Sequence, residues 1–334
     1  MILVVLLVVL GGGALVYQHQ DRTQRPENVG TLGRTLFKDL KVADIAAIRI
    51  QEPKATLTLQ RKDERWVLAE RADFPADLAR VREFVLKVIG LKVGQSEPLG
   101  EKDRARLNLD ASGTRVEFND AQGKTLGAFV AGKKYFKREV ENPDKAIPDG
   151  RFVALPSEAG TAYLVGDPLT QASARTSEWI DRASFQVEKV KTLEVRYPGG
   201  GGYRIERQAD NAEWKLAGAN PGEKLDISRA NAASYSLSLL ELADVAPKDA
   251  VDTGLEQPVL INATTLEGAA YAIKVGKLAG ENHYVTVSAS GLKPDAKDAE
   301  RVKLLSQHVL LIPKSKLEDT LKKRSDLLEK KDKK

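Results

Sequence analysis

The sequence contains no cysteine, and only three histidines and one methionine occur among its 334 residues. The absence of cysteine excludes a disulfide framework, a cysteine-ligated zinc site, a thiol nucleophile and a lipoprotein anchor. What is present is an ordinary globular balance, with 42% hydrophobic and 30% charged residues. A chain of this length is enough for about two domains, each able to bury a core.

An excess of charge of one sign is also missing from most of the chain. The formal net charge is +5, and residues 322–334 alone, with seven Lys or Arg and three Asp or Glu, account for +4 of it. The rest of the chain therefore lacks the basic stripe expected of a nucleic-acid-binding protein. We interpret residues 314–334 as a charged, solvated helical tail, with a lipid- or partner-binding patch as the alternative.

Residues 1–17 form a long apolar run without a charged or strongly polar side chain. This length is at the short end of what a helix needs to cross a bilayer, and the run predicts a retained membrane anchor. A cleaved signal peptide is the alternative, with a weak cleavage site at Gly12-Gly13-Ala14. Arg22, Arg25 and Arg34 follow the run and no basic residue precedes it, which opposes an orientation with the body outside the cytoplasm. Either the free α-amine determines the orientation, or the true start lies upstream.

An internal repeat is the most informative feature of the sequence. Residues 40–50 match residues 185–195, with five apolar positions aligned at an offset of 145. Three further matches follow in the same order at offsets of 144–148: Trp66 with Trp214, Leu109-Asp110 with Leu255-Glu256, and Gly132-Lys133 with Gly276-Lys277. Matches in this order predict a duplicated module.

Each copy is predicted to begin with short strands and to continue with one helix. In the first copy, apolar–polar alternation around Ile48 and Leu57 and the run at Trp66 predict a meander of three strands. The helix is predicted over 77–91, with Asp77 as its N-cap and an apolar face of Leu78, Val81, Phe84, Val85, Val88 and Leu91. In the second copy the helix is predicted at about 227–242, with a face of Ile227, Ala230, Ser234 and Leu237.

Further strands are predicted after each helix, at 114–119, 125–131, 152–155 and 162–165 and at 258–264, 270–276, 283–288 and 308–312. The polar stretches 137–150 and 289–300 are interpreted as loops at corresponding places. This order predicts an α+β fold: two tandem repeats of a mainly antiparallel sheet, each with one packed amphipathic helix, after an N-terminal transmembrane helix. The predicted segments are 1–17 (membrane anchor or signal peptide), 18–35 (linker), 36–166 (first module), 167–183 (connector), 184–313 (second module) and 314–334 (charged helical tail).

A search for motifs predicts no catalytic, cofactor-binding or metal-binding residue and no cofactor. His19, His283 and His308 do not share a helical turn, and the latter two fall in predicted strands as sheet residues. Ser288, Ser290 and Ser306 have no recognisable base, and no G-x-S-x-G motif is present. Asp and Glu are abundant, so a glycosidase-like pair of carboxylates stays open.

Three features resemble binding motifs but are better explained as structure. Gly123-Lys124-Thr125 resembles the end of a P-loop, yet it lies between two strands and predicts a hairpin turn. The run 199–202 is four glycines, and it precedes a strand rather than a helix that could hold phosphate. Trp66 and Trp214 are predicted to pack on the sheet rather than to form a ligand platform.

Taken in order, the motifs are similar to those of a bacterial family, the domain of unknown function numbered 4340. They are Arg65-Trp66-Val67-Leu68, Pro75-Ala76-Asp77, Asn108-Leu109-Asp110 and Gly254-Leu255-Glu256, within a resemblance that covers most of residues 36–315. Asn108 stands where the family usually has glycine, and the second copy lacks a clean Pro-Ala-Asp. The resemblance implies an envelope protein with one N-terminal anchor. It also implies an accessory role to a gliding-motility-type ABC transporter, whose components are often encoded beside such proteins.

We therefore expect a non-enzymatic, membrane-anchored protein of the cell envelope. Residues 1–17 would hold it in the bacterial inner membrane, with the bulk of the chain in the periplasm. ABC transporter components or another envelope protein are the expected partners, and nucleic acid is not. The alternative is an extracytoplasmic hydrolase that acts on glycans through an unidentified carboxylate pair. The oligomeric state stays open.

Overall fold

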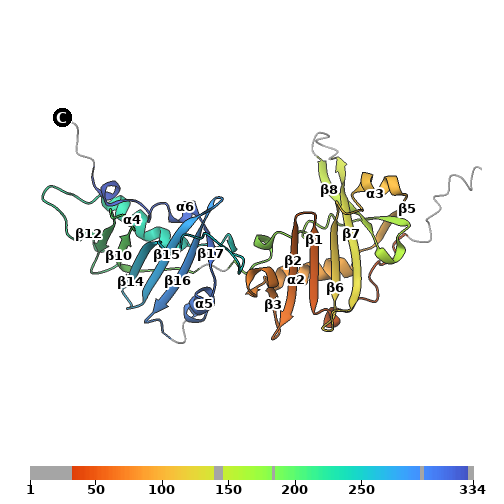
Figure 1. Cartoon of the computed structure of the whole chain (residues 1–334), viewed down its shortest axis with the longest axis horizontal. Coiled ribbons are helices and arrows are strands. Elements are labelled where there is room, and N and C mark those ends of the chain that lie inside the picture. The colour runs from red at the N-terminus through yellow and green to blue at the C-terminus, as the bar shows by residue number, and fades with distance from the viewer. Residues whose placement is uncertain (1–31, 139–145, 183–184, 294–296, 330–334) are drawn as a thin grey trace, which may run out of the picture. The chain divides into compact units, whose positions relative to one another are not determined.

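The computed structural model describes residues 32–138, 146–182, 185–293 and 297–329 (Figure 1). The predicted membrane segment 1–17 and His19 lie outside the described residues, and none of the described helices is long and apolar enough to span a membrane. By their contacts the residues divide into two compact units. One joins the residues up to Thr56 with Arg82–Ala174, and the other joins Leu57–Val81 with the residues from Arg175 onward.

The first sheet is antiparallel throughout its paired strands, as the sequence predicts. It has nine strands, in the order β4-β3-β2-β1-β6-β7-β8-β9-β5. Their bounds in that order are Phe74–Pro75, Arg65–Leu68, Ala55–Lys62, Ala47–Glu52, Thr114–Asn119, Thr125–Arg138, Ala146–Ala154, Thr161–Val165 and Val93–Pro98. The predicted meander and all four later strands are confirmed, although β7 and β8 are longer than predicted.

Helix α2 (Leu78–Ile89) packs on this sheet with one apolar face. Its start is confirmed, because the Asp77 side chain accepts hydrogen bonds from the backbone N–H groups of Ala79 and Arg80 at 2.9 and 3.1 Å. The Phe84 ring stacks on Phe118 of β6 at 6.2 Å between centroids. The buried face consists of Val81, Phe84, Val85 and Val88. Leu78 was predicted to belong to it but is 54% exposed, because it lies at the edge of that face in the first turn.

The second sheet has eight strands, again paired antiparallel, in the order β12-β11-β10-β14-β15-β16-β17-β13. Their bounds in that order are Lys215–Leu216, Tyr203–Glu206, Val190–Arg196, Val259–Thr265, Ala270–Ala279, Asn282–Ser290, Leu310–Pro313 and Asp244–Val245. Helix α4 (Ile227–Tyr235) begins after Asp226, whose side chain accepts from the N–H of Arg229. It ends earlier than the predicted 242 and continues only as the 3-10 turn η5 (Ser236–Leu239).

The two sheets share one order of strands once the short edge strand β4 is set aside. The sequence β3-β2-β1-β6-β7-β8-β9-β5 corresponds position by position to the order of all eight strands of the second sheet. Trp66 lies in β3, and Trp214 directly precedes β12, which occupies the same place. Helices α2 and α4 likewise follow the third strand of their own set.

Three predicted details are corrected. Helix α3 (Glu101–Leu107) was not predicted, because Leu107 is its one buried residue and a single apolar position gives no helical periodicity. Helix α5 (Lys297–Leu305) begins inside the stretch interpreted as a polar loop, since its first half is charged and only Val302 and Leu305 are buried. Over its described residues, 314–329, the tail forms α6 (Lys314–Leu317) and the 3-10 turn η6 (Arg324–Leu327) rather than one continuous helix. The remaining 3-10 turns are η1 (Val42–Asp44), η2 (Ala69–Arg71), η3 (Pro156–Glu158) and η4 (Thr176–Glu178).

The repeated Gly-Lys pair marks a β-bulge in each sheet, at Gly132 in β7 and Gly276 in β15. A Cβ at Gly132 would lie 2.2 Å from the carbonyl oxygen of Leu107, and a Cβ at Gly276 would lie 2.2 Å from that of Thr253. Glycine is therefore required for the preceding loop to approach the strand.

The repeated Asn/Gly-Leu-Asp/Glu motif supplies that loop. Asn108 and Gly254 both have positive φ, of 54° and 71°. Asn is one of the few residues other than glycine that adopts this conformation readily, which explains its presence in the first copy. Both repeated motifs thus serve backbone geometry.

In each sheet, the segment that follows β9 or β17 returns to the start of the helix packed on that sheet. We call this segment the strap: residues 167–182 for the first sheet and 314–329 for the second. In the first strap, Trp179 O accepts from Asp77 N at 2.8 Å and Asp181 N donates to Pro75 O at 3.0 Å. In the second, Leu327 O accepts from Asp226 N and Glu329 N donates to Lys224 O, both at 2.9 Å. The two straps close their helices with the same pair of backbone hydrogen bonds.

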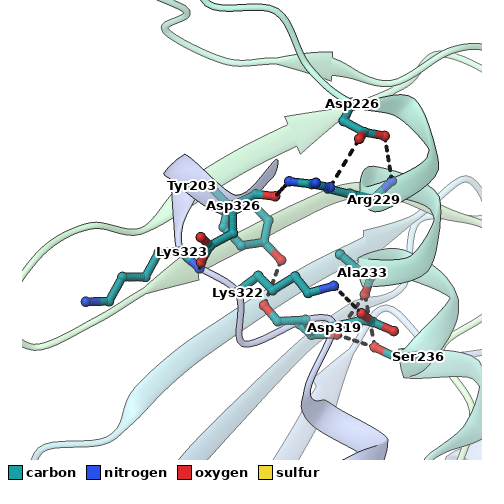
Figure 2. A network of polar contacts seen from close by, with 10 residues as sticks. Tyr203, Asp226, Arg229, Ala233, Ser236, Asp319, Lys322, Lys323 and Asp326 are labelled. Carbon is teal, nitrogen blue, oxygen red and sulfur yellow. Dashed lines mark hydrogen bonds and ion pairs between the residues drawn. The ribbon is translucent and has the colours of Figure 1, made fainter. Parts of the chain in front are cut away.

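The second strap is also fixed by buried polar contacts (Figure 2). Thr320 is fully buried, and its Oγ1 donates to Ala233 O at 2.7 Å. The Tyr203 hydroxyl donates to Thr320 O at 2.8 Å, and burial raises the pKa of this tyrosine.

Farther along the second strap, Arg324 forms an ion pair with Glu223 at 2.6 Å. Together with Asn220 it lowers the pKa of the Glu223 carboxyl to about 2. Leu317 and Leu327 are fully buried. The strap is therefore part of the fold.

Candidate functional site

A hollow of about 640 Å³ in the second unit is a candidate binding site; we call it the Trp214 groove. It lies between the start of β10, the loop that follows β11 and the helix α4. Its lining includes Glu188, Lys189, Arg207, Trp214, Asn231 and Tyr235. The size suits a small ligand or a short segment of a larger one.

The floor of the groove is an arginine stacked on a tryptophan. Trp214 is 3% exposed, and its indole N–H donates to Asn231 Oδ1 at 3.0 Å. The Arg207 guanidinium carbon lies 4.7 Å from the centre of the Trp214 ring, a cation–π arrangement. Arg207 also donates to Val190 O at 2.8 Å and forms an ion pair with Asp210 at 2.6 Å. The indole N–H of Trp214 and the guanidinium of Arg207 are therefore already engaged.

The first sheet carries a related pair. Arg61 of β2 lies opposite Trp66 of β3 in the strand register, as Arg207 of the second sheet lies beside Trp214. Trp66 is only half-buried. The shared pair supports the prediction that the tryptophans pack on the sheet. The contact between Arg207 and Trp214 was not predicted from the sequence. An arginine shortly before each tryptophan, Arg61 and Arg207, could have indicated it.

The rim of the groove is what a ligand would meet. Tyr235 is 66% exposed, and Glu188 and Lys189 are exposed beside it. The lining includes Ser234 and Ser238 but no histidine, and Ser238 Oγ donates to Tyr235 O at 2.7 Å. The Ser238 hydroxyl thus donates to a backbone carbonyl rather than to a side-chain base. The rim offers an aromatic face and hydrogen-bonding groups, which suit binding.

The two described histidines have separate environments. His283 lies in β16 as predicted, and its Nδ1 is 3.0 Å from the carbonyl oxygen of Gly276, at the β-bulge. His308 was predicted in a strand but precedes β17, and burial lowers its pKa. In the described ranges of the chain no group of three or more His, Asp or Glu side chains could hold a metal ion.

Both glycine-containing sequences that resemble phosphate-binding loops are turns. Gly123 has a φ of 81° and lies between β6 and β7, where Asp120 accepts from the N–H groups of Gln122 and Lys124 at 3.0 and 2.8 Å. The glycines at 199–202 connect β10 with β11, and a Cβ at Gly202 would lie 2.1 Å from Val195 O. The hairpin turn predicted at Gly123 is confirmed, and the glycine run precedes a strand, β11, as predicted.

The family model described as Domain of unknown function (DUF4340) matches residues 66–258. The chain belongs to the DUF4340 family. The match begins at Trp66 in β3 and ends just before β14, so a single family domain takes in parts of both sheets. No curated protein and no solved structure matches the chain.

Proposed function

We propose that this DUF4340 protein is a non-enzymatic, membrane-anchored component of the bacterial cell envelope that assists a gliding-motility-type ABC transport system. The roles of the repeated residues support the proposal that the protein is not an enzyme. The Gly-Lys bulges, the Asn/Gly-Leu-Asp/Glu loops and the Arg–Trp pairs all serve packing and backbone geometry. A duplicated fold that repeats only such positions is suited to present surfaces to partners.

We propose further that the chain carries two tandem copies of one module. The common strand order supports this, as does the closure of each helix by its own strap. Equivalent hydrogen bonds at Asp77 and Asp226 are separated by 149 positions, close to the offsets of the sequence repeat. The limits 36–166 and 184–313 stay predictions, and the straps suggest adding 167–182 and 314–329 to them.

The membrane placement rests on residues 1–17, whose apolar character suits a helical anchor. A tether would confine the protein to the membrane that holds the permease. It would thereby raise the effective concentration of the protein at the permease. The glycan-hydrolase alternative has no specific support in the Trp214 groove, because Asp210 there is paired with Arg207.

The partner is tested by purification of the full chain, with an affinity tag after Lys334, from native membranes after cross-linking in cells. We expect permease and ATPase subunits of an ABC transporter to be enriched. The matched control replaces residues 1–17 with a cleavable signal peptide, so that the same body reaches the periplasm without a tether. Enrichment should fall strongly in this control. Recovery of no transporter subunit with the tethered chain would refute the accessory role.

A further inference from the structure

Strands β7 and β8 extend beyond the first sheet as a two-stranded ribbon, residues 134–138 and 146–150 (Figure 1). Strand β6 pairs with β7 only as far as Ala131, and β9 pairs with β8 only from Arg151 onward. Within the ribbon the two strands pair only with each other. Four residues beyond Lys134 correspond to a projection of roughly 13 Å at the rise of an extended strand.

This ribbon exposes large apolar side chains next to lysines. Tyr135, Phe136 and Ile147 are 45%, 50% and 41% exposed. Lys134 and Lys137 are exposed beside them, and Lys137 lies opposite Ile147 in the register. By strand alternation, Tyr135, Lys137 and Ile147 share one face of the ribbon. Apolar side chains gathered on a protruding element mark an interaction surface.

The ribbon leaves the sheet at the end where the chain enters it. In the strand register, Lys134 pairs with Arg151, Arg151 with Val165, and Val165 with Val93, so these residues form one row across the sheet. It ends at Gly33, whose N–H donates to Val93 O at 2.8 Å. The segment that leads back toward residues 1–17 therefore joins the sheet on the same side from which the ribbon projects.

We propose that the face formed by Tyr135, Lys137 and Ile147 docks on a membrane surface that contains anionic phospholipid. This inference rests on the proposed anchoring, which places a bilayer on the side where the chain enters the sheet. Aromatic side chains are favoured at the membrane–water interface, and lysines are attracted to anionic headgroups.

The absence of cysteine allows a direct test with the full chain in proteoliposomes. Ile147→Cys carries the environment-sensitive dye NBD, and Gln122→Cys is the matched control. Gln122 is exposed in the turn between β6 and β7, at the opposite end of β7. In vesicles of phosphatidylglycerol and phosphatidylcholine we expect a blue shift and a several-fold rise in emission at 147, with quenching by spin-labelled lipid. Neither change should occur at 122.

Three results would overturn the inference. These are equal spectra at 147 and 122, an equal shift at 147 in vesicles of phosphatidylcholine alone, and a shift that requires added transporter subunits, which would indicate a protein contact instead. Lys137→Glu, on the docking face, should reduce the shift, and unchanged denaturant unfolding should show that the fold is intact. Flotation after an alkaline wash reports the anchor separately. A chain that floats without a shift at 147 refutes only the docking, whereas a chain that does not float refutes the anchoring and the docking together.

Discussion

Ending the chain at Pro313 is expected to unfold the second sheet. The deletion removes Leu317 and Leu327, both fully buried, together with the hydrogen bonds of Thr320 to Ala233 and Tyr203. Loss of two buried leucines alone should cost at least about 4 kcal/mol, and a domain has only about 5–15 kcal/mol of stability in total. Because the first sheet keeps its own strap, one of two unfolding transitions should disappear.

Denaturant unfolding followed by circular dichroism measures this effect, with hydrogen exchange to assign the lost transition. The matched control ends the chain at Glu329, which removes five residues but retains all the described contacts of the strap. Its unfolding should equal that of the full chain. Two transitions of unchanged midpoint in the shorter chain would show that residues 314–329 are a dispensable tail, as the sequence alone suggested.

The substitution Val85→Asp is expected to destabilise the first sheet severely. Val85 is 3% exposed on the face of α2 that packs with Phe84 on the sheet. An aspartate there buries a carboxylate without a partner, at a cost of about 3–5 kcal/mol. The loss should appear as a lower denaturant midpoint of one transition.

Two controls lie on the same helix. Leu86 is 55% exposed, so Leu86→Asp makes the same apolar-to-acidic change in solvent and should cost less than about 1 kcal/mol. Arg82 is also exposed, and Arg82→Asp should behave likewise. A similar loss of stability in all three variants would mean that α2 does not pack on the sheet through the face described.

Sequence periodicity was sufficient for the elements that bury one regular face. The strand pattern around Ile48 and Leu57 and the capped helix at Asp77 follow from alternation, spacing and the N-cap, and the structure contains them. Helix α3 and the second strap were missed for a different reason. Their few buried side chains, such as Leu107 and Leu317, stand alone among charged residues. Only tertiary contacts reveal that such segments are part of the core.

The site shows the same limit. The recurrence of Trp66 and Trp214 predicted packing roles, and Trp214 is buried as such a role requires, whereas Trp66 is half-buried. The Trp214 groove arises because Arg207, Asn231 and Tyr235, from separate elements, meet around one side chain. Most of the exposed ribbon falls within residues 137–150, which were predicted to be a polar loop, because its length beyond the sheet depends on where its neighbours β6 and β9 stop pairing. Neither arrangement is encoded in local spacing.

The folded body is expected to lie outside the cytoplasm, tethered by residues 1–17. This topology is tested by labelling Gln122→Cys, the sole thiol of that variant, with a membrane-impermeant maleimide in spheroplasts. We expect full labelling before lysis, on a chain that stays with the membrane after an alkaline wash. Labelling on a chain released into the soluble periplasmic fraction would retain the compartment but replace the anchor with a signal peptide. Labelling only after lysis would place the body in the cytoplasm and contradict the envelope assignment.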